Sequence, residues 1–158
     1  MRGEWVTFFL AQVGASAALT GLVFVALSIN LSQIIGQPDL VGRAGEAVIL
    51  LVQPVIVGLA VLTPYSRTTV GILILVAAGI AWVALVRLLI NSDTEAQRPK
   101  VERMYRLTST QLAAVPAVIG AVVLIAGGDG YGFLAFGAVM SIAVGVMDGW
   151  VLLVEILR

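Results

Sequence analysis

The sequence predicts an all-helical integral membrane protein with five transmembrane helices in one domain, residues 1–158. Of these residues, 60% are hydrophobic and 11% are charged, whereas soluble domains carry about 25% charged residues. So few charged side chains would not cover the surface of a soluble fold. Five apolar segments have the length of about 20 residues that a helix needs to cross a bilayer.

The predicted spans cover residues 5–35, 44–63, 69–90, 107–126 and 131–158. Turn-forming or charged residues separate them, namely residues 36–39, 64–66, 91–106 and 127–130. The first span is about 46 Å long at 1.5 Å per residue, so it must tilt or extend beyond the bilayer. Arg2 and the small residues 14–17 also resemble a cleavable signal peptide, but apolar character continues through Ile29, which favours a span.

The distribution of basic residues predicts the orientation, because cytoplasmic loops carry an excess of Lys and Arg. With five spans, two basic residues lie on the N-terminal side, Arg2 and Arg67. Six lie on the other side, namely Arg43, Arg98, Lys100, Arg103, Arg106 and Arg158. We therefore expect the N-terminus outside and the C-terminus in the cytoplasm.

Pro54 and Pro116 predict kinks in the second and fourth spans, since proline removes a backbone donor. Gln53 or Thr110 could supply the missing donor, or a kink could line a wet cavity; a kink that only helps packing is the simpler interpretation. Both prolines begin the pattern P-x-x-x-G-x-x-V-L. The second and third spans are therefore a possible parallel repeat of the fourth and fifth.

The fifth span carries small residues at intervals of four: Gly137, Ser141, Gly145 and Gly149. Such a ladder lets another helix approach closely. The first span carries a second small patch, Gly14, Ala17, Ala18 and Gly21. These faces predict helix packing within one subunit or across a homo-oligomer, and the pattern does not separate the two.

Polar side chains inside spans are costly and therefore informative. At 100° per residue, Gln12, Ser16, Thr20 and Asn30 share one face of the first span, which predicts either a pore lining or interhelical hydrogen bonds.

Arg87 and Asp148 are predicted at the same depth, about 26 Å from the outer interface, and are candidates for an ion pair. Five further polar residues would join them in a polar vestibule on the inner side, namely Glu46, Gln53, Asn30, Gln33 and Glu155. The alternatives are a structural ion pair and an ion or proton pathway.

The chain contains no His and no Cys, which removes the commonest general base, the thiol nucleophile and the usual metal ligands. It also lacks the glycine-rich Walker pattern of nucleotide-hydrolysing enzymes. We therefore expect no enzymatic activity, no metal, no cofactor and no nucleic-acid partner.

Residues 14–30, the Pro-containing loop after them and residues 43–46 resemble the opening of a family of small, uncharacterised bacterial polytopic membrane proteins. The resemblance covers about the first third of the chain. It implies a bacterial plasma-membrane location and transfers no functional residues.

Two functions follow from these observations. The first is a homo-oligomeric channel or transporter for an ion or small solute, supported by the polar stripe and the inner charges. The second is a non-conducting accessory or scaffold subunit that docks a membrane partner protein through its small-residue faces. In both, the lipid bilayer is the first partner.

Overall fold

The computed structural model describes residues 3–90 and 100–156, which form six α-helices and no strand. Their bounds are α1 Gly3–Ile29, α2 Leu31–Ile35, α3 Pro38–Leu62, α4 Arg67–Ile90, α5 Lys100–Ile125 and α6 Tyr131–Ile156. Among the described helices, all but the short α2 are long and apolar enough to cross a membrane. The predicted class of five transmembrane helices is confirmed. Arg2, Arg98 and Arg158, which contribute to the predicted orientation, lie outside the described residues.

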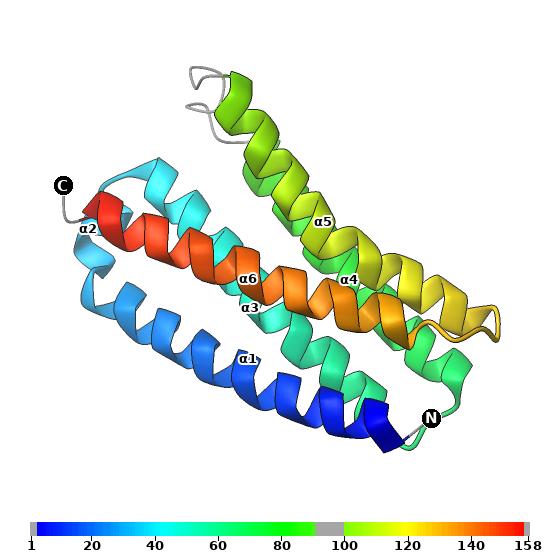
Figure 1. Cartoon of the computed structure of the whole chain (residues 1–158). Helices are drawn as coiled ribbons and strands as arrows, with labels where there is room; N and C mark the ends of the chain where they lie inside the picture. Colours follow the sequence, from blue (N-terminus) through cyan, green and yellow to red (C-terminus); the bar gives the residue numbers. More distant parts are fainter. Residues whose placement is uncertain (1–2, 91–99, 157–158) are drawn as a thin grey trace.

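The five long helices run in alternating directions (Figure 1). The start of α1 and the α3–α4 and α5–α6 turns lie at one end, called here the N-side end; α2 and the end of α6 lie at the C-side end. The central helix is α3, which packs against α1, α4 and α6, while α5 packs against α4 and α6. Toward the C-side end, α4 and α5 diverge from α3 and α6 (Figure 1).

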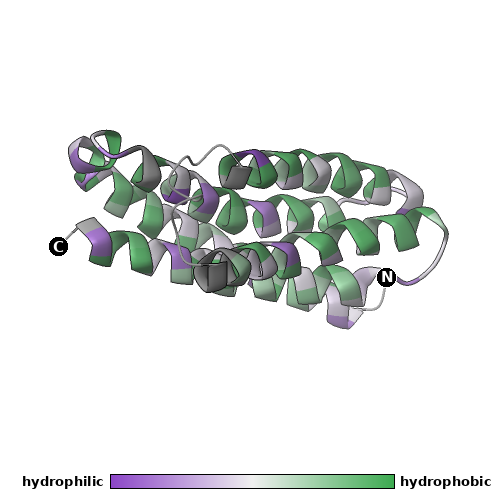
Figure 2. Ribbon diagram, turned by 90° about the horizontal axis from the view of Figure 1, so that it is seen from above, coloured by the Kyte–Doolittle hydropathy of each residue, from purple (hydrophilic) through white to green (hydrophobic). Residues whose placement is uncertain are grey.

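Apolar residues cover most of the length of the helices (Figure 2). Large apolar side chains point outward; Leu22, Ile29, Ile80 and Trp150 expose 65–76% of their surface. A soluble monomer rarely exposes apolar patches of this extent, whereas lipid chains would cover them at no cost. The surface therefore fits a multi-pass membrane protein.

An aromatic cluster closes the N-side end of the bundle. The ring centroids of Trp5 and Tyr131 lie 6.3 Å apart, and Phe8 and Phe9 pack edge to face at 5.2 Å. Phe9 is fully buried and joins an apolar core formed by residues of α3, α4, α5 and α6. This end therefore holds the helices together through aromatic and aliphatic contacts.

The first span is shorter than predicted, because the helix breaks at Asn30 and resumes as α2. The Asn30 Nδ2 amide donates a hydrogen bond to the Ala26 carbonyl at 2.9 Å. Asparagine side chains compete with the backbone for such bonds, which favours a helix end. Ile34 of α2 then packs against Leu40 of α3 and Leu152 of α6, so α2 lies across the C-side end and does not extend the span.

Pro54 leaves the Leu50 carbonyl of α3 without its helical donor, and serines of two other helices bond this carbonyl and the next one. The missing Pro54 N–H would have bonded the Leu50 carbonyl four residues earlier. The Ser141 hydroxyl of α6 donates to that oxygen at 2.6 Å, and the Ser16 hydroxyl of α1 donates to the Leu51 carbonyl at 2.7 Å. The expected donors, Gln53 and Thr110, do not fill this role. The two serine bonds thus join α3 to both α1 and α6 near Pro54.

This arrangement predicts that Ser141→Ala lowers the free energy of unfolding by about 1 kcal/mol, the usual scale of an interhelical hydrogen bond in a membrane protein. The cost should fall to near zero in a Pro54→Ala background, because an alanine N–H would satisfy the Leu50 carbonyl again. Reversible unfolding in mixed micelles measures both values. An equal cost in the two backgrounds would contradict the link between the proline and the serine.

The small-residue ladder of α6 packs within the chain. A Cβ added to Gly145 would lie 2.9 Å from Leu51 Cγ of α3, and at Gly137 3.1 Å from the Ala117 nitrogen of α5. At Gly149 it would lie 3.4 Å from a Val23 methyl of α1. The ladder therefore lets α6 approach three helices, and the alternative that it joins subunits is not needed to explain it.

The small-residue patch of α1, in contrast, does not pack against another helix of the chain. Its four residues, Gly14, Ala17, Ala18 and Gly21, are exposed, and no atom lies within 4 Å of a Cβ built at either glycine.

The predicted repeat stays a prediction. Both prolines lie inside helices, Pro54 in α3 and Pro116 in α5. A twofold axis that related α3 to α5 and α4 to α6 would convert the α3–α6 contact into the α5–α4 contact. Both contacts are present. The surroundings of the two prolines differ, however. Gly79 stands 62 residues before Ser141, so the hydroxyl that serves the Pro54 kink has no counterpart on α4.

Candidate functional site

A buried carboxylate lies where the two diverging groups of helices meet. Glu46 is near the start of α3, inside a span, and its side chain is fully buried. The Thr110 hydroxyl of α5, also fully buried, donates to Glu46 Oε1 at 2.7 Å. A buried carboxylate needs such donors, because removing it from water is costly. This bond links α3 to α5, two helices that otherwise make little contact.

The Glu46–Thr110 bond lies beside an apolar cluster on its N-side. Leu50, Ala113 and Ala114 follow Glu46 and Thr110 by one turn on their helices and are fully buried with Leu85 of α4. The packed alanines bring α5 close to α3. The polar bond is therefore at the C-side edge of a tightly packed region, where it is near the diverging ends of the helices.

An ion pair lies one turn further toward the C-side end. Arg43 Nη1 of α3 is 3.3 Å from Glu155 Oε1 of α6, and the two side chains are 11% and 38% exposed. Arg43 and Glu46 stand three residues apart, so they share one face of α3. The sequence placed both Arg43 and Glu155 near the inner side without pairing them; their common depth on adjacent helices was the available signal.

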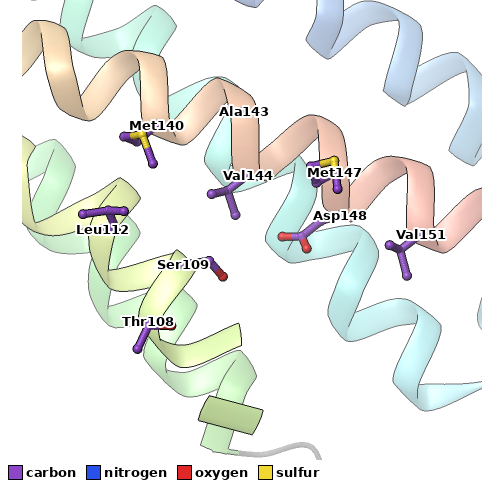
Figure 3. A pocket seen from close by; sticks show the side chains of 9 residues that line it. All are labelled: Thr108, Ser109, Leu112, Met140, Ala143, Val144, Met147, Asp148 and Val151. Atoms are coloured by element: carbon purple, nitrogen blue, oxygen red, sulfur yellow. The ribbon is translucent and has the colours of Figure 1, made fainter. Parts of the chain in front are cut away.

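Asp148 lines a hollow of about 390 Å³ between α5 and α6 (Figure 3). Its carboxylate reaches from α6 toward α5, where Thr108 and Ser109 line the same hollow. The remaining lining is apolar and includes Leu112 and Met140. Thr110, which bonds Glu46, follows Ser109 directly on α5, so the two carboxylates approach the same turn of this helix.

The expected Arg87–Asp148 pair is not formed. Arg87 is exposed on α4 and borders a hollow lined by α4 residues alone, among them Leu75 and Val83. α4 packs against α5 and α3, whereas Asp148 lies on α6 and faces α5. The depth of both residues was estimated from their place in the sequence, but depth does not fix the side of the bundle to which a side chain points.

Gln53 and Asn30 do not join the carboxylates either. Gln53 is buried nearly two turns from Glu46 toward the N-side, where it borders a small void with Leu134 and Ser141. Its Oε1 accepts no hydrogen bond from the described part of the chain. Asn30 ends α1 through its bond to Ala26. Of the residues predicted for the inner vestibule, Glu46, Asp148 and Glu155 lie toward the C-side end, where Thr110 bonds Glu46 and Arg43 pairs with Glu155.

The polar stripe of α1 faces α3. Gln12 and Ser16 are buried, the Ser16 hydroxyl bonds the Leu51 carbonyl, and the Thr20 hydroxyl bonds the Ser16 carbonyl at 2.7 Å. Gln12 packs over Gly58, where a Cβ would lie 2.6 Å from Gln12 Oε1. The burial of Gln12 and Ser16 against α3 contradicts a pore lining at these two positions. In the described part of the chain Ser16 makes an interhelical hydrogen bond, whereas Thr20 and Asn30 bond carbonyls of α1 and neither amide atom of Gln12 has a hydrogen-bond partner.

Comparison with known proteins does not assign this chain to a family. No family model matches the chain, and no curated protein and no solved structure is significantly similar to it. The resemblance of the first third to small bacterial membrane proteins stays a prediction. Function is therefore argued from the geometry of the polar residues themselves.

Proposed function

We propose that this chain carries a proton or a small cation across a membrane, with Glu46 as the group that binds it. The observation that carries the proposal is a fully buried carboxylate inside a span, hydrogen-bonded to Thr110. Ionisable side chains are rare at such places because they are costly there. Where they occur they commonly mark ion or proton pathways.

The surroundings of Glu46 support a carrier. Two lateral hollows flank the diverging helices at this level, the α5–α6 hollow of about 390 Å³ and an α3–α4 hollow of about 260 Å³ lined by Ile49 and Ala81 among others. The aromatic cluster around Trp5 and Tyr131 closes the opposite end. Glu46 is fully buried and lines neither hollow, so an ion would reach it only after the helices move apart, as helices do between the two states of a carrier.

Motion of the α4–α5 pair against α1, α3 and α6 would change this access. Pro54 and Pro116 lie inside the two helices that the Glu46–Thr110 bond connects. Ion sites in many transporters lie at interrupted helices between such groups. The buried stripe of α1 argues against an open channel along a symmetry axis, so the carrier is the favoured form.

Flux into liposomes tests the proposal. Purified protein is reconstituted with a pH-sensitive dye inside, and proton, sodium and potassium gradients are imposed in turn. We expect Glu46→Gln to reduce the flux at least about tenfold, because a side chain that cannot ionise lacks the charge that binds the cation. The amide oxygen of the substituted side chain can still accept a hydrogen bond from Thr110, so the fold should persist.

Glu4→Gln is the matched control, because Glu4 is exposed in the first turn of α1. It should conduct as the unchanged protein does. Flux no greater than in protein-free liposomes under every gradient would overturn the proposal. Equal flux in the Glu46→Gln protein and in the unchanged protein would show that Glu46 is not the group that binds the ion.

A second candidate is a non-conducting accessory or scaffold subunit. The exposed patch of α1 favours it, since small residues at Gly14, Ala17, Ala18 and Gly21 would let a helix of a second copy or of another membrane protein approach closely. Absence of flux together with a stable complex after mild detergent extraction would favour this function. The patch is equally compatible with self-association of a carrier.

A further inference from the structure

The hollow between α5 and α6 has polar side chains in its C-side half and an apolar lining toward the middle of the helices. Ser109 and Asp148 extend toward one another from the two helices (Figure 3), whereas the Thr108 hydroxyl bonds the Met104 carbonyl of its own helix at 2.9 Å. One turn or more toward the middle of the helices, the lining becomes Leu112, Met140 and Val144. Both walls are therefore apolar toward the middle of the helices, and on α6 the apolar Val151 also lies one turn beyond Asp148 on the C-side.

Size and lining fit a small amphiphile. The volume of about 390 Å³ lies within the usual range of small-molecule sites, about 300–1,000 Å³. Met140 and Met147 can adapt their shape to a flexible chain. Since the C-side half carries the Asp148 carboxylate and the Ser109 hydroxyl, the complementary head group is a cation that donates hydrogen bonds.

The depth of Asp148 selects the kind of amphiphile. Asp148 is seven residues before Glu155, where the span ends, which places it about 10 Å inside that end at 1.5 Å per residue. The ammonium group of an ethanolamine lipid lies at the surface, above a phosphate that would have to follow it into the apolar region. A single-chain amine has no such group and can move inward until its ammonium reaches the carboxylate.

We propose that the α5–α6 hollow binds a single-chain amphiphilic amine, with its ammonium group at Asp148 and its chain along Leu112, Met140 and Val144. The amine enters sideways from the leaflet on the C-side. An amphiphile in that leaflet already has its head group toward the C-side and its chain toward the middle of the bilayer, as the hollow requires. This site is distinct from Glu46, so its occupation does not depend on the ion flux proposed above.

Binding of dodecylamine tests the proposal directly. The full chain is placed in phosphatidylcholine nanodiscs, and bound dodecylamine is measured after subtraction of its partition into empty nanodiscs. Dodecanol, with the same chain and no charge, and dodecanoate, with the opposite charge, are the ligand controls. We expect dodecylamine to bind more tightly than either, and Asp148→Asn to weaken it roughly tenfold while dodecanol is unchanged.

Two further variants separate binding from folding. Ala143→Phe fills the hollow from an exposed position on α6, so it should abolish amine binding and leave the thermal unfolding temperature unchanged. Asp129→Asn removes an exposed carboxylate in the α5–α6 turn and should bind dodecylamine as before.

Three outcomes would overturn the proposal. The first is equal affinity of Asp148→Asn and the unchanged protein for dodecylamine. The second is equal binding of the amine, the alcohol and the carboxylate, which would indicate partition alone. The third is loss of amine binding in phosphatidylethanolamine nanodiscs, which would identify a lipid head group as the occupant. None of these depends on whether the protein conducts.

Discussion

Replacement of Gly145 by Leu is expected to lower the free energy of unfolding by about 3 kcal/mol, the upper range for overpacking a close contact. A Cβ at this position would already lie 2.9 Å from Leu51 Cγ and 3.2 Å from Leu50 Cβ. A whole leucine side chain would push α6 away from α3. The bond from Ser141 to the Leu50 carbonyl, one turn away on α6, would lengthen as well.

Gly132→Leu is the control, since it makes the same replacement on the same helix at an exposed position with no atom within 4 Å of the added Cβ. It should be neutral or slightly stabilising, because glycine weakens a helix. The two unfolding free energies are compared in one mixed-micelle titration. Similar values for both variants would mean that α6 does not approach α3 as described.

Thr110→Val is expected to cost about 2 kcal/mol of unfolding free energy, the scale of a hydrogen bond to a charged group. Valine has nearly the shape of threonine, so the loss reports the missing donor to Glu46 rather than a cavity. In a Glu46→Leu background the same substitution should cost nothing, since the hydroxyl then has no carboxylate to serve. The difference between the two backgrounds is the coupling energy of the pair.

Thr7→Val supplies the matched control, because its exposed hydroxyl bonds the Gly3 carbonyl within α1. A change within about 0.5 kcal/mol is expected there. If Thr110→Val cost the same with and without Glu46, the 2.7 Å contact would contribute nothing to stability. The proposed ion site would then lose its link between α3 and α5.

Much of the fold followed from hydropathy and turn residues. The predicted spans overlap α3, α4, α5 and α6 because apolar length and Gly or Pro breaks act locally along the chain. Two helix starts were predicted too late: α3 begins at Pro38 instead of residue 44, and α5 begins at Lys100 instead of residue 107, because polar residues can extend a helix beyond its apolar part. The first span was wrong at its end. Asn30 belongs to an apolar run by composition, and only its side-chain bond to Ala26 shows that the helix stops there.

The polar residues were harder to assign. Glu46 and Asp148 were singled out because charges inside spans are rare, and that reasoning does not depend on packing. The Arg87–Asp148 pair failed because α4 and α6 are not packing neighbours. The Arg43–Glu155 pair escaped notice because residues near span ends resemble ordinary interfacial charges.

The sequence by itself determined the class of five membrane-spanning helices, and roughly where along its helix each polar group lies. Helix length and position along a helix follow from counting consecutive residues, so the sequence alone gives them. Only the tertiary structure decided which helices touch. It turned the α1 stripe toward α3, placed Ser141 on the carbonyl that Pro54 left open and set Thr110 against Glu46. These contacts join residues 35 to 91 positions apart, and they depend on the rotation and order of the helices, which hydropathy does not encode.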